Sequence, residues 1–389
     1  MFQLTPTQKK QFLFCCIAFA VTGMMALSIG SLLPFIRDDY ELSYDFSGML
    51  LSLHSVGNLF SSFFSGMLAF SIGRRKSMLF FSVFMLFAYL ILASFSAPFL
   101  LAAAFLSSGL ARGASSNFTN VTINEAVPGK AWALNVIHAA FAVGALIMPL
   151  LVVFCTHNDP AGWKSICFLM IGLSLLCMLL YANIPLSETT AVRQNKARDL
   201  SFLKEKSFVL GTAALFCYLC AEQGVIGWLV TYLQDAGILS ASLAQTMASV
   251  LWLLILTGRL SVAWLSGRYP RSRLLCFMGG GFAFFFAVLL FGRTLPMVLV
   301  GIIGFGLSMA GIYPTVVSCS GDLIKREPFA WSVMLPIASL GSILMPSIIG
   351  LVADSFGIFA GMSTVSVAVG VTVLLLVLIS RENKKKEAA

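Results

Sequence analysis

The segment GALIMP at residues 144–149 recurs as GSILMP at residues 341–346, an offset of 197 residues (341 minus 144). A second echo agrees with it, because the GRR of residues 73–75 is answered by the GR of residues 267–268, 194 residues later (267 minus 73). Both offsets are close to half of the 389-residue chain. Duplication at half the chain length is typical of membrane carriers whose two repeats move about a central site.

The composition is that of a membrane protein. Apolar residues make up 59% of the chain and charged residues only 11%, whereas soluble domains carry about 25% charged residues. Apolar runs of about 20 residues, the length that spans a bilayer, fit onto the chain twelve times. The sequence therefore predicts an all-α membrane protein with twelve transmembrane helices in two pseudo-symmetric six-helix bundles. We expect these bundles at residues 1–186 and 207–389, joined by a cytoplasmic central linker at 187–206.

The net charge of +9 does not indicate nucleic-acid binding, because the positive charges follow a membrane topology. With a cytoplasmic N-terminus, twenty Lys and Arg fall in predicted cytoplasmic segments, and three, Arg37, Lys164 and Arg293, face outward. This asymmetry satisfies the positive-inside rule and predicts both termini in the cytoplasm. We expect a multi-pass monomer in a bacterial inner membrane, with the lipid bilayer and a small-molecule substrate as partners and no nucleic acid.

The sequence does not indicate an enzyme, a metal site or a bound cofactor. Nine cysteines lie almost wholly inside the predicted spans, and the pair Cys217 and Cys220 lacks a second pair or a His cluster that would complete a metal site. A phosphate-binding loop of the form GxxxxGKS or GxxxxGKT does not occur. Transport would therefore be driven by a proton or sodium gradient, or would be simple facilitation.

The loop after the second span, GMLAFSIGRRK at residues 66–76, resembles the GxxxDxxGRK signature of the major facilitator superfamily. The likeness covers the whole chain through span count, central linker and the second signature near residue 267. Phe70 stands where the family usually has Asp, so the inward gate attributed to that acid must be weaker or built otherwise. The resemblance implies a gating role for Gly73, Arg74, Arg75, Gly267 and Arg268.

Two stretches resemble the fucose:proton symporter branch of that superfamily, which also contains glucose carriers. They are Leu134–His138 with Gly144, and Ala221–Leu229 with Tyr232, which is like the branch's AExxxGGWLxxY segment. This resemblance implies a monosaccharide substrate and proton symport.

Two departures qualify the comparison with known branches. The acids expected in the first and fourth helices of fucose carriers are missing near Ala26 and Ser116, so substrate and coupling ion can differ. The drug:proton antiporter signature of the fifth helix is met only at Gly144 and Pro149, which disfavours an antiporter.

Glu222 is the one acid of sixteen that falls near the middle of a predicted span. A carboxylate inside a bilayer is costly, which makes Glu222 a candidate for proton coupling or substrate binding. The alternative is a structural role, in which Glu222 bonds a backbone amide or Arg259 of the eighth span. A salt bridge with Arg259 could equally be structural or gating. Arg112, in the fourth span, is a candidate clamp for an anionic substrate group, with bonding to helix carbonyls as the alternative.

Neutral polar side chains supply further candidates. Asn117, Asn120 and Asn124 share one face of the fourth span. Carboxamides offer donors and acceptors to a polyhydroxylated ligand, or they form hydrogen bonds between helices.

Two histidines share a helix face with a carboxamide, His54 with Asn58 and His138 with Asn135. Both histidines are candidate proton carriers or ligand contacts, and buried, hydrogen-bonded histidines are the alternative. In the second half, an aromatic and polar substrate wall beside Glu222 would use Gln223, Trp228, Trp252 and Tyr313, although such aromatics more often serve packing.

These residues predict a secondary active transporter that imports a small polar solute, with a monosaccharide as first choice, by alternating access and proton symport. The alternative is an organic-anion or sugar-acid carrier that uses Arg112. A drug/proton antiporter, a receptor without transport activity and a lipid scramblase rank below both.

The repeated segments also predict where the two halves move. Pro149 and Pro346 should bend their helices at matching depth. Gly144 and Gly341, just before them, should permit close approach of the opposite bundle. We therefore expect these four residues to form part of the gating contact.

Overall fold

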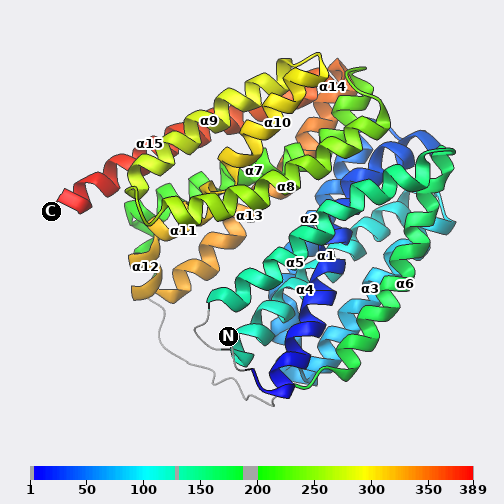
Figure 1. Ribbon diagram of the computed structural model, residues 1–389, viewed down its shortest axis with the longest axis horizontal. Helices are drawn as coiled ribbons and strands as arrows, with labels where there is room; N and C mark the ends of the chain where they lie inside the picture. Colours follow the sequence, from blue (N-terminus) through cyan, green and yellow to red (C-terminus); the bar gives the residue numbers. More distant parts are fainter. Residues whose placement is uncertain (1–3, 128–130, 187–199, 389) are drawn as a thin grey trace. The chain divides into compact units, whose positions relative to one another are not determined.

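The computed structural model describes residues 4–127, 131–186 and 200–388, which form helices and no strand (Figure 1). The helices of the first half are α1 (Pro6–Asp39), α2 (Tyr44–Ile72), α3 (Arg74–Ser94), α4 (Pro98–Ala126), α5 (Ala131–Thr156) and α6 (Trp163–Asn183). Those of the second half are α7 (Lys206–Asp235), α8 (Ala241–Leu265), α9 (Arg271–Phe291), α10 (Leu295–Met309), α11 (Ile312–Cys319), α12 (Gly321–Arg326), α13 (Pro328–Phe356), α14 (Ile358–Ser363) and α15 (Val365–Ala388). Short 3-10 helices, η1 (Pro160–Gly162) and η2 (Ser201–Lys204), precede α6 and α7.

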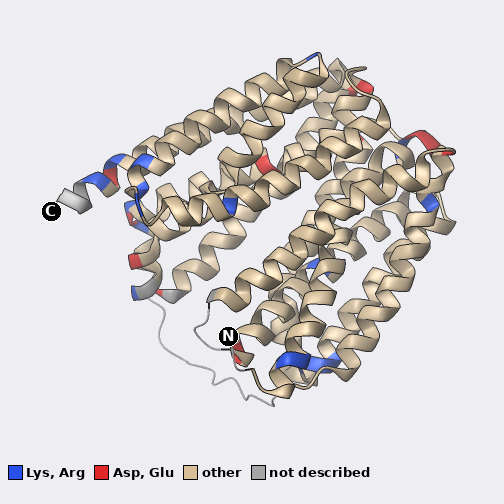
Figure 2. Ribbon diagram, in the orientation of Figure 1, with Lys and Arg blue, Asp and Glu red and all other residues tan. Residues whose placement is uncertain are grey.

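Most of these helices have the length and composition of membrane spans. Eleven segments within the described ranges are long and apolar enough to cross a bilayer. The remaining predicted span is α4, which has 29 residues and carries Arg112 together with the three carboxamides. Charged residues lie mainly at helix ends, with long uncharged stretches between them (Figure 2). The predicted all-α membrane fold is therefore confirmed.

The chain divides into two compact units. The first contains Met1–Leu42 and Leu53–Gln194, and the second contains Ser43–Ser52 and Asn195–Ala389. Helix α2 therefore begins in the second unit and continues in the first, which the expected boundaries at 186 and 207 did not include. Most of the predicted linker, residues 187–199, lies outside the described residues.

Close packing holds the start of α2 within the second unit. A Cβ atom added at Gly48 would lie 2.5 Å from the carbonyl oxygen of Pro346 on α13. A Cβ atom at Gly350 would lie 2.3 Å from the carbonyl oxygen of Tyr44. One turn further along α2, the Ser52 hydroxyl bonds the Ile343 carbonyl at 2.5 Å. Glycine is therefore required at both contact points, because any side chain would meet backbone atoms.

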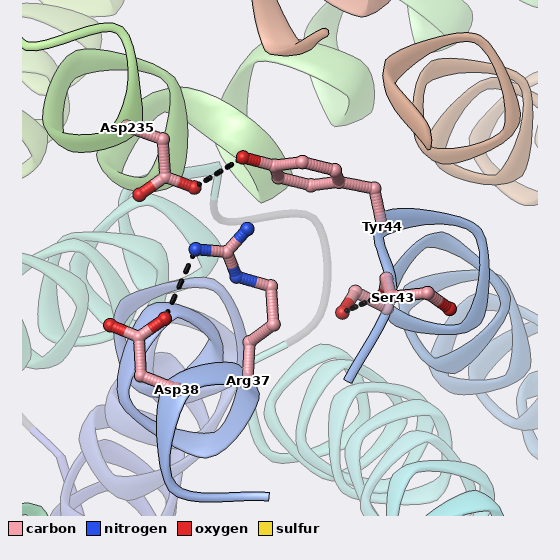
Figure 3. Close-up of polar contacts among 6 residues, drawn as sticks. Arg37, Asp38, Ser43, Tyr44 and Asp235 are labelled. Atoms are coloured by element: carbon pink, nitrogen blue, oxygen red, sulfur yellow. Dashed lines mark hydrogen bonds and ion pairs between the residues drawn. The ribbon is translucent and has the colours of Figure 1, made fainter. Parts of the chain in front are cut away.

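Two carboxylates bind the first residue of α2. The Tyr44 hydroxyl donates to Asp235 of α7 at 3.0 Å, as Figure 3 shows, and the Tyr44 N–H donates to Asp354 of α13 at 3.2 Å. A negative charge at a helix N-terminus is favourable, because the first amides have no partner inside the helix. In the first unit, Arg37 pairs with its neighbour Asp38 at 3.0 Å (Figure 3).

The repeated glycines lie at equivalent helix crossings, one in each unit. A Cβ atom at Gly144 of α5 would lie 1.8 Å from the Ala20 carbonyl oxygen of α1. A Cβ atom at Gly341 of α13 would lie 2.2 Å from the Phe216 carbonyl oxygen of α7. The interpretation of these glycines as contacts with the opposite bundle was therefore wrong, because each packs against a helix of its own unit. Helices α5 and α13 continue through Pro149 and Pro346 without interruption.

Candidate functional site

The mid-span acid of the second unit is held by a tyrosine of its own helix. Glu222 and Tyr218 lie one turn apart on α7, and the Tyr218 hydroxyl donates to Glu222 Oε1 at 2.8 Å. The same hydroxyl lies 3.2 Å from the carbonyl oxygen of Met309, at the end of α10. Tyr218 is 1% exposed. Its hydroxyl therefore lies in the protein interior, where the low dielectric constant strengthens hydrogen bonds.

The tenth span is broken beside the Met309 carbonyl. Helix α10 ends at Met309, and α11 begins at Ile312. Pro314 lacks an N–H, and its ring would clash with the carbonyl of Ala310 in a continuous helix, so the chain interrupts the helix one turn earlier. The Tyr218 hydroxyl donates to the Met309 carbonyl at this break.

Two further groups surround this acid. Tyr313 of α11 lies with its ring centroid 6.4 Å from that of Tyr218. Both tyrosines are within electrostatic reach of Glu222 and of Arg259 on α8. No ion pair forms between Glu222 and Arg259, both of which the structure describes. The salt bridge with Arg259, which the sequence left open as a structural or gating contact, does not form in this conformation.

The other candidates of the second unit separate into packing residues and residues near Glu222. Trp228 is fully buried, and its indole N–H donates to the Pro346 carbonyl at 3.1 Å. We therefore assign Trp228 to helix packing and not to a substrate wall. Trp252 of α8 is 8% exposed, and Gln223 is partly exposed beside Glu222 on α7.

In the first unit, His54 of α2 is buried between two groups of α4. Its Nδ1 lies 2.7 Å from the Ser108 hydroxyl, and its Nε2 lies 3.3 Å from Arg112 Nη1. The Ser108 hydroxyl donates its own proton to the Phe105 carbonyl at 2.7 Å, so it must accept from Nδ1–H. A neutral imidazole then presents the Nε2 lone pair to the guanidinium. His54 is fully engaged, and we assign it to positioning Arg112 and not to proton transfer.

The three carboxamides of α4 do not act as one stripe. Asn117 donates to the Ser65 hydroxyl of α2 at 3.0 Å. Asn120 donates to the Ser116 carbonyl of its own helix at 2.8 Å, so its oxygen accepts from His138 Nε2 of α5 at 3.2 Å. Asn124 is exposed near the end of α4. The helical spacing is as expected, but neighbouring helices bind the side chains separately.

His138 is exposed, and Asn135, one turn earlier on α5, is exposed as well. Asn58 is partly exposed on α2, and its backbone carbonyl accepts a hydrogen bond from Ser62 at 2.7 Å. The accessible polar group of this unit is therefore the Asn120–His138 pair with Asn135 beside it.

The basic loop between α2 and α3 is shaped by one glycine and by two arginine contacts. Gly73 has a φ of +87°, a left-handed conformation that favours glycine. Arg74 forms a bidentate ion pair with Glu125 at the end of α4, with both N–O distances 2.6 Å. Arg75 donates to the Ile184 carbonyl after α6 at 2.9 Å. These contacts therefore tie the start of α3 to α4 and to the end of α6 within one unit.

The second copy of the signature differs in detail. Gly267 does not have a left-handed φ, since the described glycines with positive φ are Gly73, Gly237 and Gly357. The Arg268 guanidinium stacks on the Trp264 ring at 3.6 Å from its centroid and makes a cation–π contact in place of an ion pair. The two loops are therefore related in sequence but not in structure.

The family model described as Major Facilitator Superfamily matches residues 13–327. A protein named TsgA homolog from Buchnera aphidicola subsp. Schizaphis graminum is 19% identical and covers 95% of this chain and 96% of its own length. An MFS-type transporter from Bacillus subtilis, YfkL, is 23% identical over 88% of both chains. The crystal structure of the nucleoside transporter NupG superposes with a TM-score of 0.71 at 14% identity, over 96% of this chain and 98% of that one. The family match covers most of the chain, and the fold agrees with it: this protein belongs to the Major Facilitator Superfamily and is a secondary transporter.

Proposed function

We propose that the protein imports a small uncharged polar solute together with a proton, and that Glu222 binds the proton. The observation that carries this proposal is the setting of Glu222: an acid in mid-helix, bonded by one tyrosine hydroxyl and without an ion-paired cation among the described residues. Acids inside a membrane mark ion pathways and proton relays.

The neutral character of the first unit's accessible polar group supports an uncharged solute. The Asn120 amide and the His138 imidazole offer donors and acceptors without a fixed charge. Hydroxyl groups of a sugar act as both donors and acceptors, so they match such a pair. Together with the likeness of residues 134–144 and 221–232 to the fucose:proton symporter branch, this favours a monosaccharide.

Uptake by proteoliposomes tests the proposal. The purified chain should accumulate a labelled neutral hexose when the outside is more acidic than the lumen. Accumulation should cease when the pH gradient is removed and persist when sodium is omitted. Uptake that depends on sodium, or hexose transport that a pH gradient does not drive, would contradict proton symport.

The second candidate function is an organic-anion or sugar-acid carrier, and the His54–Arg112 contact favours it. A neutral His54 orients the guanidinium of Arg112 without cancelling its charge. An oriented guanidinium is the side chain best suited to a carboxylate.

Substitutions separate the two functions. For a neutral solute, Asn120→Ala or His138→Ala should weaken binding about fivefold to tenfold, the effect of losing one hydrogen bond, and Arg112→Gln should weaken it less. Asn117→Ala is the matched control, because its carboxamide bonds Ser65. Solute affinities from competition uptake decide between them. Binding of a sugar acid but not of hexoses, abolished by Arg112→Gln alone, would establish the anion carrier.

The Arg74–Glu125 pair gives a prediction for the gate. Arg74→Glu and Glu125→Arg should each slow transport, and the double charge swap should restore part of the rate, because the two groups bind each other. For a pair with 21% and 32% exposed side chains, the coupling free energy should be about 0.2–1 kcal/mol. Initial uptake rates of the four proteins measure it. Strictly additive effects would show that the pair does not act as a unit.

A further inference from the structure

We infer that the Tyr218 hydroxyl passes the protonation state of Glu222 to the break between α10 and α11, through the carbonyl of Met309. The inference rests on the proton-binding role proposed for Glu222 and adds a positioning residue to it. It follows from one hydroxyl group that faces two acceptors, at 2.8 Å and 3.2 Å. A tyrosine hydroxyl carries a single proton, so it donates fully to only one of them.

When Glu222 is ionised, its carboxylate accepts the hydrogen bond from the Tyr218 hydroxyl. A hydrogen bond to a charged acceptor is shorter and about twice as strong as one to a neutral carbonyl. The observed distances follow this order, since Glu222 Oε1 is nearer to the hydroxyl than the Met309 oxygen is. The end of α10 is then held only weakly by α7.

Protonation of Glu222 changes which acceptor binds the proton of the Tyr218 hydroxyl. Glu222 takes one proton from the water phase and becomes a neutral acid, whose O–H is a donor. That O–H donates to the Tyr218 oxygen, and the Tyr218 hydroxyl keeps its own proton but turns it to the Met309 carbonyl. The tyrosine gains and loses no proton, so the balance is one proton taken up by Glu222. The result is a chain of hydrogen bonds from Glu222 through Tyr218 to Met309.

The break is the part of the fold able to respond. The Tyr218 hydroxyl reaches the Met309 carbonyl at the end of α10. Pro314 has no N–H, so the carbonyl of Ala310, four residues earlier, cannot receive the usual helical hydrogen bond across the break. A full hydrogen bond from Tyr218 therefore fastens the end of α10 to α7, and its loss releases that end.

The titratable groups around Glu222 come from α7, α8 and α11. The titratable groups that reach the cluster are Tyr218 itself, Tyr313 of α11 and Arg259 of α8. Helices α13, α14 and α15 also pack on α7, but their charged residues lie at the far ends, at Asp354 and from Arg381 onward. No second acid among the described helices competes for the proton.

Hydrogen–deuterium exchange of the full chain tests the inference. Exchange of the segment around residues 306–313 is followed over a pH series and corrected for the intrinsic exchange rate. In the wild type, protection of this segment should rise about fivefold as Glu222 becomes protonated, the effect of one hydrogen bond. In Tyr218→Phe the protection should no longer depend on pH. Tyr232→Phe is the matched control, because it removes a hydroxyl of the same helix that bonds a carbonyl, that of Leu290, and not a carboxylate.

A second variant keeps the test decisive if Tyr218→Phe does not fold. Glu222→Gln mimics the neutral acid, so its protection should stay at the low-pH level of the wild type at every pH. Protection in Tyr218→Phe that still follows pH as in the wild type, or in Glu222→Gln that stays at the high-pH level, would overturn the link. Proton-driven uptake is scored separately. If uptake needs Glu222 but the exchange result fails, the proposed function stands without the link. If uptake needs no proton while Tyr218→Phe abolishes the pH response, the link stands and the proposed function fails.

Discussion

Replacement of Glu222 by Gln should abolish accumulation of the solute against its gradient while exchange of solute across the membrane continues. Glutamine keeps the size of the side chain and can still bond Tyr218, but it cannot bind and release a proton. A difference of one pH unit supplies about 1.4 kcal/mol, enough for about tenfold accumulation of a neutral solute that moves with a proton. The wild type should show this accumulation, and the variant should stop at equal concentrations on both sides.

The measurement is uptake of labelled solute with and without a pH gradient, beside counterflow at equal pH. Asp322→Asn is the matched control, since it removes the charge of an acid on α12 and should accumulate solute normally. Wild-type accumulation by Glu222→Gln would show that the proton is bound elsewhere or that none is carried.

Gly144→Leu and Gly341→Leu should prevent stable folding of their units. Each new side chain would collide with a backbone carbonyl, of Ala20 or of Phe216, at 1.8 Å and 2.2 Å from the added Cβ atom. Overpacking costs about 1–3 kcal/mol where side chains can adjust, and backbone atoms adjust less. That cost is a large part of a net stability of about 5–15 kcal/mol.

Thermal unfolding in detergent and the yield of monodisperse protein measure the effect. Gly172→Leu and Gly280→Leu are matched controls on α6 and α9, because a Cβ atom at either position meets nothing within 4 Å. A normal melting temperature combined with slow transport in Gly144→Leu or Gly341→Leu would contradict the packing role and support a moving contact.

The fold could be predicted largely from the sequence, because span length and charge placement are local properties. The helix that each repeated glycine contacts could not be predicted. The spacing of Gly144 and Gly341 shows that they are equivalent, and equivalence is what the structure has: α1 beside α5, and α7 beside α13. Which helix lies opposite a glycine depends on tertiary packing, which a single sequence does not record. For the same reason, the sequence does not show that Ser43–Ser52 belong to the second compact unit.

The candidate site was predictable where one residue carries the signal. Glu222 stands out because it is a lone acid in an apolar run, and Tyr218, four residues earlier, could have been found as its neighbour on one helix face. Met309 could not, because its backbone carbonyl meets the Tyr218 hydroxyl only in the folded chain, 91 residues away in the sequence. Glu125 was missed because the signature acid was sought at Phe70, near the end of α2, whereas Arg74 binds an acid from α4.

The helical spacing also suggested that the carboxamides of α4 act together, which their separate contacts do not support. Asn117 and Asn120 are three residues apart, but their side chains bond α2 and α5 respectively. A shared helix face does not decide which neighbour each side chain reaches. His54 shows the same limit, because the Ser108 hydroxyl that sets its tautomer lies 54 residues away in the sequence.

Proton movement that accompanies the solute tests the central claim most directly. Lightly buffered proteoliposomes without an initial pH gradient receive a neutral hexose, and the external pH is recorded beside uptake of the sugar. The outside should become alkaline in step with hexose entry, the response should vanish with a protonophore, and Glu222→Gln should show none. Hexose entry by the wild type without any change of external pH would contradict proton symport through Glu222.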